Sequence, residues 1–229
     1  MNRIQASFRL EKPIDTKGIL ASLERAARTC YQSFENISKD SAIKLIKQVI
    51  SLGHESVVEH EKITVRIILS RAVMAELTRH RMASFSVEST RYCRYQNIEF
   101  IQPWWWNDIE SVDFARHAKK REIWLNCMSM AEHAYQDMLS CGMAPQGARD
   151  CLPLATKTEL VITANLREWR HIFKLRCSPR AHPDMRAIMM PIFEKFNEAL
   201  PEVFGDMKED IEADPAINRS CWAVEKEIC

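Results

Sequence analysis

Apolar residues recur at the spacing of an α-helix in several stretches of the chain. The longest stretch lies near 113–141 and is followed by Gly142, a common helix terminator. A second long stretch lies near 183–204, and shorter ones follow Asp15, span about 40–52 and span 166–175. Helices of globular proteins bury one apolar face, so each stretch predicts a helix packed on a core. In the 113–141 helix, the expected core face comprises Ile123, Trp124, Cys127, Met130, Ala131, Ala134, Tyr135, Met138 and Leu139.

Alternating apolar and polar residues predict the strands. The alternation is clearest over 62–69, and 156–163 and 4–10 are interpreted as further strands. Ser70 is placed to cap a short helix through Thr78. Helices and strands together predict an α+β fold, with packed helices on a mixed or antiparallel sheet. No repeat or flexible linker divides the sequence, so we expect a single domain over 1–229, with an acidic tail after Gly205 that packs late or frays.

The composition argues against several classes of protein. The chain has 229 residues and is 46% hydrophobic, which is enough for a sizeable core. Lys plus Arg (32) nearly balance Asp plus Glu (31), and a net charge of +1 argues against coating nucleic acid by bulk electrostatics. No stretch approaches the roughly 20 apolar residues of a membrane span, and the first residues lack a signal-peptide pattern. We therefore expect a cytoplasmic protein without a membrane partner.

Sequence patterns for metal sites and phosphate loops are missing. The eight cysteines include no C-x-x-C pair, so we expect reduced packing residues and no metal site. Five glycines provide no G-x-G-x-x-G loop. Gly142 and Gly147 have P-loop spacing, but Ala148 and Arg149 stand where Lys and Ser or Thr are needed. If the chain binds a nucleotide, its side chains must supply the anion contacts.

Residues 79–91 form an unusual arginine-rich segment. They gather three arginines, one histidine and four hydroxyl residues into thirteen positions, with no acidic residue between Glu76 and Glu88. Guanidinium groups offer paired donors that match phosphate oxygens and carbonyl edges, so the segment indicates an anion site. A solvated charged turn and a structural oligomer with acidic partners are two alternatives. A third is a nucleic-acid-binding module that uses the 79–94 arginines together with Trp104, Trp105 and Trp106.

The arginine-rich segment resembles the signature of the flavin-dependent thymidylate synthases, which reads R-H-R, seven residues, S, one residue, R. Every fixed position matches. The sequence GHESVVEH at 53–60 is similar to the family's G-H-E-[ST]-x-x-E-H segment, and 148–153, 165–167 and 175–176 resemble its C-terminal half. The resemblance covers about residues 1–204 and implies the α+β fold of that family.

The resemblance implies two neighbouring binding sites. Its FAD-side positions correspond to His54, Ser56, Arg79, His80, Arg81, Val87, Asn165, Arg167 and His171. Its dUMP-side positions correspond to Glu76, Arg79, Val87, Glu88, Ser89, Thr90, Arg91, Arg149 and Arg176. Arg176 matches the arginine implied to be catalytic, because a fixed cation stabilises uracil that has lost its N3 proton.

Three positions depart from the common family pattern. Val87 stands where many relatives have glutamate, and whether Glu88 replaces that carboxylate is left open. Val57 stands where proline is frequent, which loosens the turn without changing a donor. Glu76 occupies a position that often contacts dUMP through glutamine in relatives, so its role is open too.

The resemblance implies the reductive methylation of dUMP to dTMP. NADPH reduces FAD, methylenetetrahydrofolate supplies the carbon, and the reduced flavin supplies a hydride, with no cysteine nucleophile. The resemblance also implies a homotetramer whose sites are shared between subunits. Trp104, Trp105 and Trp106 are therefore interpreted as core or interface packing, and not as a stacking surface.

Overall fold

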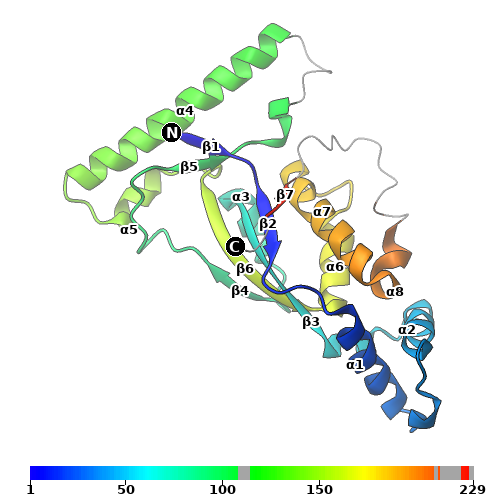
Figure 1. The fold of residues 1–229 in the computed structure, drawn as a ribbon. Helices are drawn as coiled ribbons and strands as arrows, with labels where there is room; N and C mark the ends of the chain where they lie inside the picture. Colours follow the sequence, from blue (N-terminus) through cyan, green and yellow to red (C-terminus); the bar gives the residue numbers. More distant parts are fainter. Residues whose placement is uncertain (108–113, 209–210, 212–222, 227–229) are drawn as a thin grey trace.

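A five-stranded sheet forms the centre of the computed structural model, which describes residues 1–107, 114–208, 211 and 223–226 (Figure 1). The strand order is β4-β6-β3-β2-β7. These strands are β4 (Ser84–Val87), β6 (Lys157–Asn165), β3 (Lys62–Ser70), β2 (Ser7–Leu10) and β7 (Val224–Glu225). Neighbours are antiparallel except β2 and β7, which run parallel. The predicted α+β class with a mixed sheet is confirmed.

The central strand pair follows from the alternating sequence pattern. β3 and β6 pair along nine residues, from Lys62 opposite Asn165 to Ser70 opposite Lys157. Their inward side chains are buried, namely Ile63, Val65, Ile67, Leu69, Leu160, Ile162 and Ala164. A slip of one residue would turn all of them toward the opposite face, so the pattern fixes the register. This register places Asn165 at the junction of β6 with the next helix.

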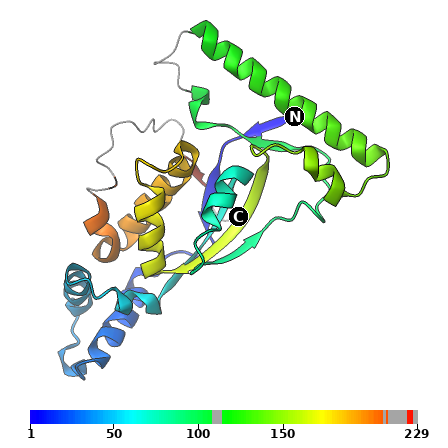
Figure 2. The same cartoon turned by 180° about the vertical axis from the view of Figure 1, so that it is seen from behind.

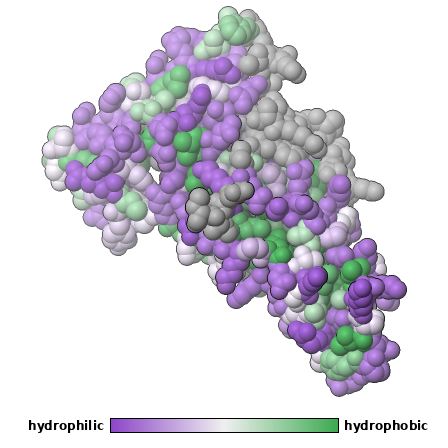
Figure 3. Space-filling view, viewed as in Figure 1, coloured by the Kyte–Doolittle hydropathy of each residue, from purple (hydrophilic) through white to green (hydrophobic). Residues whose placement is uncertain are grey.

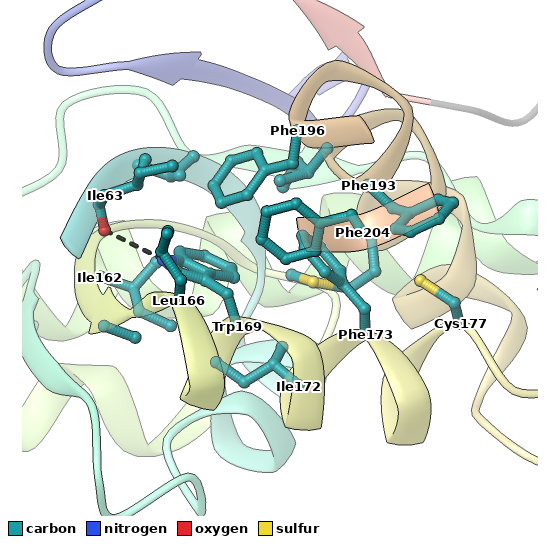
Figure 4. Close-up of a cluster of buried hydrophobic side chains, with 14 of the residues drawn as sticks. Ile63, Ile162, Leu166, Trp169, Ile172, Phe173, Cys177, Phe193, Phe196 and Phe204 are labelled. Carbon is teal, nitrogen blue, oxygen red and sulfur yellow. Dashed lines mark hydrogen bonds between the residues drawn. The ribbon is translucent and has the colours of Figure 1, made fainter. Parts of the chain in front are cut away.

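An aromatic cluster fixes helices α6 (Leu166–Arg176) and α7 (Pro183–Ala199) to the sheet (Figure 4). Its ring centroids lie 4.9 to 5.8 Å apart, and its members are Trp169, Phe173, Phe193, Phe196 and Phe204. The Trp169 Nε1–H donates to the Ile63 carbonyl at 3.0 Å, which ties α6 directly to β3. Full burial of each such side chain contributes roughly 1.5–3 kcal/mol, so the position of α6 is strongly held.

Helices α1 (Thr16–Thr29) and α2 (Ser41–Ser51) pack against each other at one end of the molecule (Figure 1). Asp15 caps α1, as predicted, by accepting a hydrogen bond from the Gly18 N–H at 3.0 Å. Gly53 follows α2 with a φ of 73°, a left-handed conformation that glycine adopts without strain. The chain then enters the 3-10 helix Glu55–His60, which leads into β3.

Helix α4 (Phe114–Ser140) projects from the sheet and its helices (Figures 1 and 2). We call it the arm. It rests on the strand pair β1 (Asn2–Ile4) and β5 (Glu99–Ile101) and on α5 (Pro145–Ala148). The predicted strand over 4–10 is thus divided, because β1 pairs with β5 whereas β2 pairs with β3. Asp113, where the helix was expected to begin, lies outside the described residues.

The expectation that the whole apolar face of the arm is core is wrong within this chain. Ile123 is 58% exposed and Met130 is 71% exposed. The buried residues of α4 are His117, Met128, Glu132, Tyr135 and Leu139. A helix of 27 residues that rests on a short strand pair buries only one narrow strip of its surface. The tip where α4 begins accordingly shows hydrophobic surface in Figure 3.

The C-terminal part departs from the sequence expectation in two ways. The helix expected near 183–204 is broken, because α7 ends at Ala199 and α8 (Pro201–Phe204) follows. Leu200 has a φ of −136°, since a residue before proline is pushed out of the helical region. The tail was expected to pack late or fray, yet Met207, Ile211 and Ala223 belong to the main hydrophobic core.

The sequence analysis expected no membrane-spanning segment and reduced cysteines. None of the helices within the described ranges combines the length and the apolar character needed to cross a bilayer. The six cysteines that the structure describes are free thiols, whereas Cys221 and Cys229 lie outside those ranges.

Candidate active site

Four side chains form a hydrogen-bonded cluster, here called the Arg176 network: Glu76, His80, Glu168 and Arg176. The Arg176 Nε–H donates to His80 Nε2 at 3.0 Å, and Nη2 donates to the Glu76 carbonyl at 2.8 Å. Arg176 Nη1 lies 3.6 Å from the Glu76 carboxylate. On the other side of the ring, His80 Nδ1 lies 3.2 Å from Glu168 Oε1. His80 is buried and joins α6 to the residues that follow α3 (Arg71–Leu77).

Backbone hydrogen bonds hold His80 in this position. Ser70 caps α3, as predicted, because its Oγ accepts from the Val73 N–H at 3.3 Å. After the helix, the His80 N–H donates to the Leu77 carbonyl at 3.2 Å, and the His80 carbonyl accepts from the Ala83 N–H at 3.1 Å. β4 begins at the next residue and pairs with β6. The R-H-R sequence is therefore anchored between a helix and the sheet.

The surroundings of His80 decide its protonation state. Burial lowers the pKa of His80 below its ordinary value of 6.5, the Arg176 cation lowers it further, and Glu168 opposes both effects. The ring is therefore neutral near pH 7. Because an arginine Nε always carries a proton, His80 Nε2 must accept, and the ring proton resides on Nδ1 and points to Glu168.

His80 and Glu168 of the network also lie close to His171, in a grouping that resembles a metal site. His80, Glu168 and His171 place possible ligand atoms within 4.8 Å of one another. Both nitrogens of His80 are already engaged, however, and the Arg176 cation lies against the ring. A metal ion needs an available nitrogen lone pair and repels a neighbouring cation. We therefore interpret the group as a hydrogen-bonded cluster.

A cavity of about 740 Å³ adjoins the Arg176 network. Helix α6 supplies one wall through Arg167, Glu168, His171 and Lys174, and Asn165 lies at its start. The Asn165 side chain caps α6 by accepting from the Glu168 N–H at 2.8 Å. Three positions that the sequence assigned to FAD, Asn165, Arg167 and His171, thus line one cavity.

Acidic residues pair with the arginines of this cavity. The Arg167 Nη1 lies 2.5 Å from a Glu59 carboxylate oxygen, and this pair is half exposed. Arg170 is buried and bonds to Glu55 at 3.0 Å and to Asp206 at 2.7 Å. The pair of Arg170 with Asp206 therefore fastens α6 to the chain after α8. An exposed ion pair contributes little stability, so Arg167 can exchange Glu59 for an anionic ligand.

Four of the residues that the sequence analysis assigned to the dUMP side lie near one another: Ser89, Thr90 and Arg91 directly follow β4, and Arg149 reaches them from a distant part of the chain. The Arg149 Nη1–H donates to Thr90 Oγ1 at 3.2 Å, which brings together two segments that are distant in sequence. Ser89 Oγ accepts from the Arg91 N–H at 3.3 Å. The Arg91 side chain is exposed, and its guanidinium lies 5.4 Å from the centroid of the Tyr92 ring. We call Ser89, Thr90, Arg91 and Arg149 the phosphate-side group.

Glu88 has structural partners. Its Oε1 accepts from the Tyr95 hydroxyl at 2.8 Å, and its Oε2 accepts from Lys157 Nζ and from the Glu159 N–H, both at 3.1 Å. This carboxylate ties the chain after β4 to β6. Val87 is 36% exposed at the end of the edge strand. These partners engage both carboxylate oxygens of Glu88.

The remaining site residues of the sequence analysis are exposed and do not line the cavity. They are His54, Ser56, Arg79 and Arg81. Ser56 shares a 3-10 helix with Glu55 and Glu59, and Arg81 precedes Met82, and these neighbours do line the cavity. His54, Ser56 and Arg81 therefore lie next in sequence to cavity residues without forming its wall, whereas Arg79 adjoins His80 of the Arg176 network.

The structure also adds residues that the sequence analysis missed. Glu168, Met82 and Lys174 line the cavity, and Glu168 belongs to the Arg176 network. The spacing Asn165-x-x-Glu168 signals a helix start, which explains the position of Glu168 but not its partner. Glu168 could have been found from His171. The two residues are three apart on a helix and share a face, and the sequence had already assigned His171 to a binding site.

Known proteins resemble this chain in sequence and in fold. Residues 14–202 match the family model for "Thymidylate synthase complementing protein". A flavin-dependent thymidylate synthase from Geobacter sulfurreducens is 32% identical over 193 residues, which cover 81% of each chain. A probable flavin-dependent thymidylate synthase from Mycobacterium phage D29 is 31% identical over 194 residues, which cover 80% of this chain and 81% of that protein.

A solved structure extends the likeness to the fold. The crystal structure of the UMP/dUMP methylase PolB from Streptomyces cacaoi, bound with 5-Br dUMP, matches with a TM-score of 0.77 at 20% identity. The match covers 93% of this chain and 100% of that chain, so the two share a fold. Because the family model and these relatives match most of its length, this chain belongs to the flavin-dependent thymidylate synthase family.

Proposed function

We propose that this chain is an enzyme that converts dUMP to dTMP by flavin-dependent reductive methylation. The observation that carries the proposal is the Arg176 network beside the cavity, in a chain whose relatives bear the name of this activity. The solved protein with the same fold is named as a UMP/dUMP methylase. Methylenetetrahydrofolate would donate the carbon, and NADPH would reduce the flavin.

The chemistry of the cavity suits FAD. Arg167 and Lys174 offer cations for a diphosphate, Asn165 offers an amide, and His171 offers a ring that can donate or accept. His80 and Arg81 of the R-H-R sequence would border this site, His80 through its partner Glu168 and Arg81 beside Met82. When bound, the flavin would supply the hydride that completes the methyl group. Arg167 would release Glu59 as it takes up the ligand phosphate.

Arg176 would act on the pyrimidine. Its guanidinium would stabilise the negative charge that develops on uracil, and this charge makes C5 the better nucleophile. His80 and Glu76 already hold the side chain, so little reorganisation is needed when the charge appears. Ser89, Arg91 and Arg149 would bind the dUMP phosphate through charge-assisted hydrogen bonds.

One assay tests the reaction directly. The purified protein, supplied with dUMP tritiated at C5, FAD, NADPH and methylenetetrahydrofolate, should release tritium and form dTMP. Omission of NADPH or methylenetetrahydrofolate, or removal of the bound FAD from the protein, should stop dTMP formation. The protein should also be yellow and should bleach when NADPH is added. A colourless protein without affinity for FAD, and without tritium release, would refute the proposal.

The nucleic-acid alternative has a specific obstacle in the structure. Trp106 is buried, and the guanidinium groups of Arg3 and Arg121 lie 4.2 Å and 5.1 Å from the centroid of its ring. A base cannot stack on a ring that is covered in this way. This obstacle applies to Trp106, whereas Trp104 is 36% exposed.

We also propose a homotetramer with sites shared between subunits, and a cytoplasmic location. The exposed side of the arm supports a subunit contact. Phe114, Ile123 and Met130 are each more than half exposed. Trp104 and Trp105 join Ile123 and Cys127 around a shallow cavity of about 590 Å³. Large apolar and aromatic side chains on one surface are typical of subunit contacts.

The assembly can be tested on the arm itself. Ile123→Asp with Met130→Asp should reduce the assembly that light scattering detects, because two charges would then lie in an apolar contact. Glu122→Gln on the same helix is the matched control, since Glu122 forms an exposed pair with Lys119. A wild-type mass equal to one chain of 26.6 kDa would exclude the tetramer.

A further inference from the structure

Glu168 is the one member of the Arg176 network to which the family resemblance gives no role. We propose that Glu168 is a positioning residue, which acts through His80 to orient the Arg176 guanidinium toward dUMP. The inference rests on the proposed function, because it assigns Glu168 a part in the same reaction.

The placement of Glu168 is the first support. As the third residue of α6 it occupies the position where a capping-box glutamate accepts from the backbone N–H of the N-cap residue, here Asn165. Its carboxylate instead lies 3.2 Å from His80 Nδ1. The side chains of Glu168 and His80 are only 11% and 3% exposed, so solvent competes little for this contact.

Proton positions give the second support. The Arg176 Nε–H can only donate, which leaves His80 Nε2 as the acceptor and Nδ1 as the donor. Glu168 is the acceptor for that Nδ1–H, so it stabilises the tautomer that can receive Arg176. With Glu168 removed, the proton can move to Nε2, and two donors would then face each other.

The remaining contacts of Arg176 cannot replace this restraint. The Glu76 carbonyl and carboxylate hold only the Nη end of the guanidinium. A planar group that is held at one end can rotate about its long axis, whereas contacts at Nε and Nη together fix its plane. Loss of Glu168 should therefore misorient Arg176 and leave its charge in place.

Three variants of the complete enzyme test the proposal. Glu168→Met removes the acceptor but keeps the side-chain length, and Glu168→Gln keeps an oxygen that can accept from Nδ1. Glu198→Gln, an exposed residue on α7, is the control. Mutation of a residue that orients a metal-binding side chain typically costs 10- to 100-fold, and we expect kcat of Glu168→Met to fall by about the same factor, because Glu168 orients His80 in the same way. Glu168→Gln should retain more of kcat than Glu168→Met, with KM for dUMP unchanged in both variants. FAD content is measured in parallel, because Glu168 also lines the cavity.

A double-mutant cycle separates positioning from a merely structural role. If Glu168 acts through Arg176, Glu168→Met should cost little further activity in an Arg176→Lys background. Equal losses in both backgrounds, a rise in KM in place of a fall in kcat, or a Gln variant as impaired as the Met variant would each overturn the proposal. If Glu168→Met does not fold, as judged by thermal unfolding, Glu168→Asp replaces it, because the shorter chain withdraws the carboxylate. A wild-type enzyme without tritium release would instead count against the proposed function.

Discussion

The Arg176 network and the phosphate-side group differ in how far their side chains are arranged before any ligand arrives. Arg176 is held at Nε and at both Nη atoms by partners on α3 and on the turn after it. Arg91 is exposed, and Arg149 donates one hydrogen bond to Thr90. A group that stabilises developing charge gains from being fixed, whereas groups that capture a phosphate from solvent gain from being accessible. Mutations in the Arg176 network should therefore lower mainly kcat, whereas mutations in the phosphate-side group should raise mainly KM for dUMP.

Arg176→Ala should give the largest effect. Removal of one preorganised group that stabilises a transition-state charge costs about 10²- to 10³-fold in kcat, and we expect a loss of that order. The flavin should remain bound, because Arg176 does not line the cavity. Steady-state tritium release and the flavin absorbance measure the two properties, with Arg25→Ala on α1 as the control. Near-normal turnover would remove Arg176 from the catalytic role.

Arg91→Ala should act mainly on binding. A hydrogen bond to a charged group contributes about 1.5–3 kcal/mol, so KM for dUMP should rise by roughly 10- to 100-fold while kcat changes less. Arg91→Lys should recover part of the affinity, since it keeps the charge but loses the paired donors. A fall in kcat at unchanged KM would show that the two ends of the site do not differ as proposed.

Thr90→Val should give a smaller effect of the same kind. Thr90 is buried, and valine preserves its shape while removing the oxygen that receives Arg149. One hydrogen bond contributes about 1 kcal/mol, which corresponds to about a fivefold rise in KM for dUMP. Titration of dUMP against the flavin absorbance measures the affinity independently. Unchanged affinity would mean that Arg149 does not need this partner.

The smallest expected effect is the contribution of His80 to the pH dependence of stability. The folded-state pKa of His80 is depressed, so the unfolded chain binds the proton more readily, and stability is lost as pH falls below about 6.5. The charged and titratable groups around the ring are Glu76, Glu168, His171 and Arg176. Urea unfolding of wild type and His80→Gln between pH 5 and pH 8 isolates this contribution. Parallel pH dependences for the two proteins would contradict it.

Much of the fold could be predicted because the local signals agree with the tertiary structure. Alternation identified β3 and β6, and Asp15 and Ser70 marked two helix starts that the structure confirms. β4 and β5 were missed, since each is short and three of the four residues of β4 are exposed at a sheet edge. On the arm, helical spacing located the apolar residues. It could not show which of them are buried within this chain and which are left exposed.

The site was predicted only as far as short sequence patterns reach. The R-H-R sequence and Asn165-x-Arg167 pointed to residues that the fold brings near one cavity, through α3 and through α6. Glu168 was missed because its helix-start position explained it without a partner. The acidic partners of Arg167 and Arg170 were missed as well, since Glu55 and Glu59 lie more than a hundred residues away in sequence.

Helix α6 makes chemistry and stability inseparable in this protein. One side of it is anchored by Trp169 and Phe173, and the other presents Glu168 and His171 to the site. Because the helix moves as a rigid body, a shift in its packing would displace all of its side chains together. Substitutions of the aromatic anchors would therefore lower the turnover rate before they cause unfolding. A compensating substitution in the core would restore turnover, although none of the residues changed would contact a ligand.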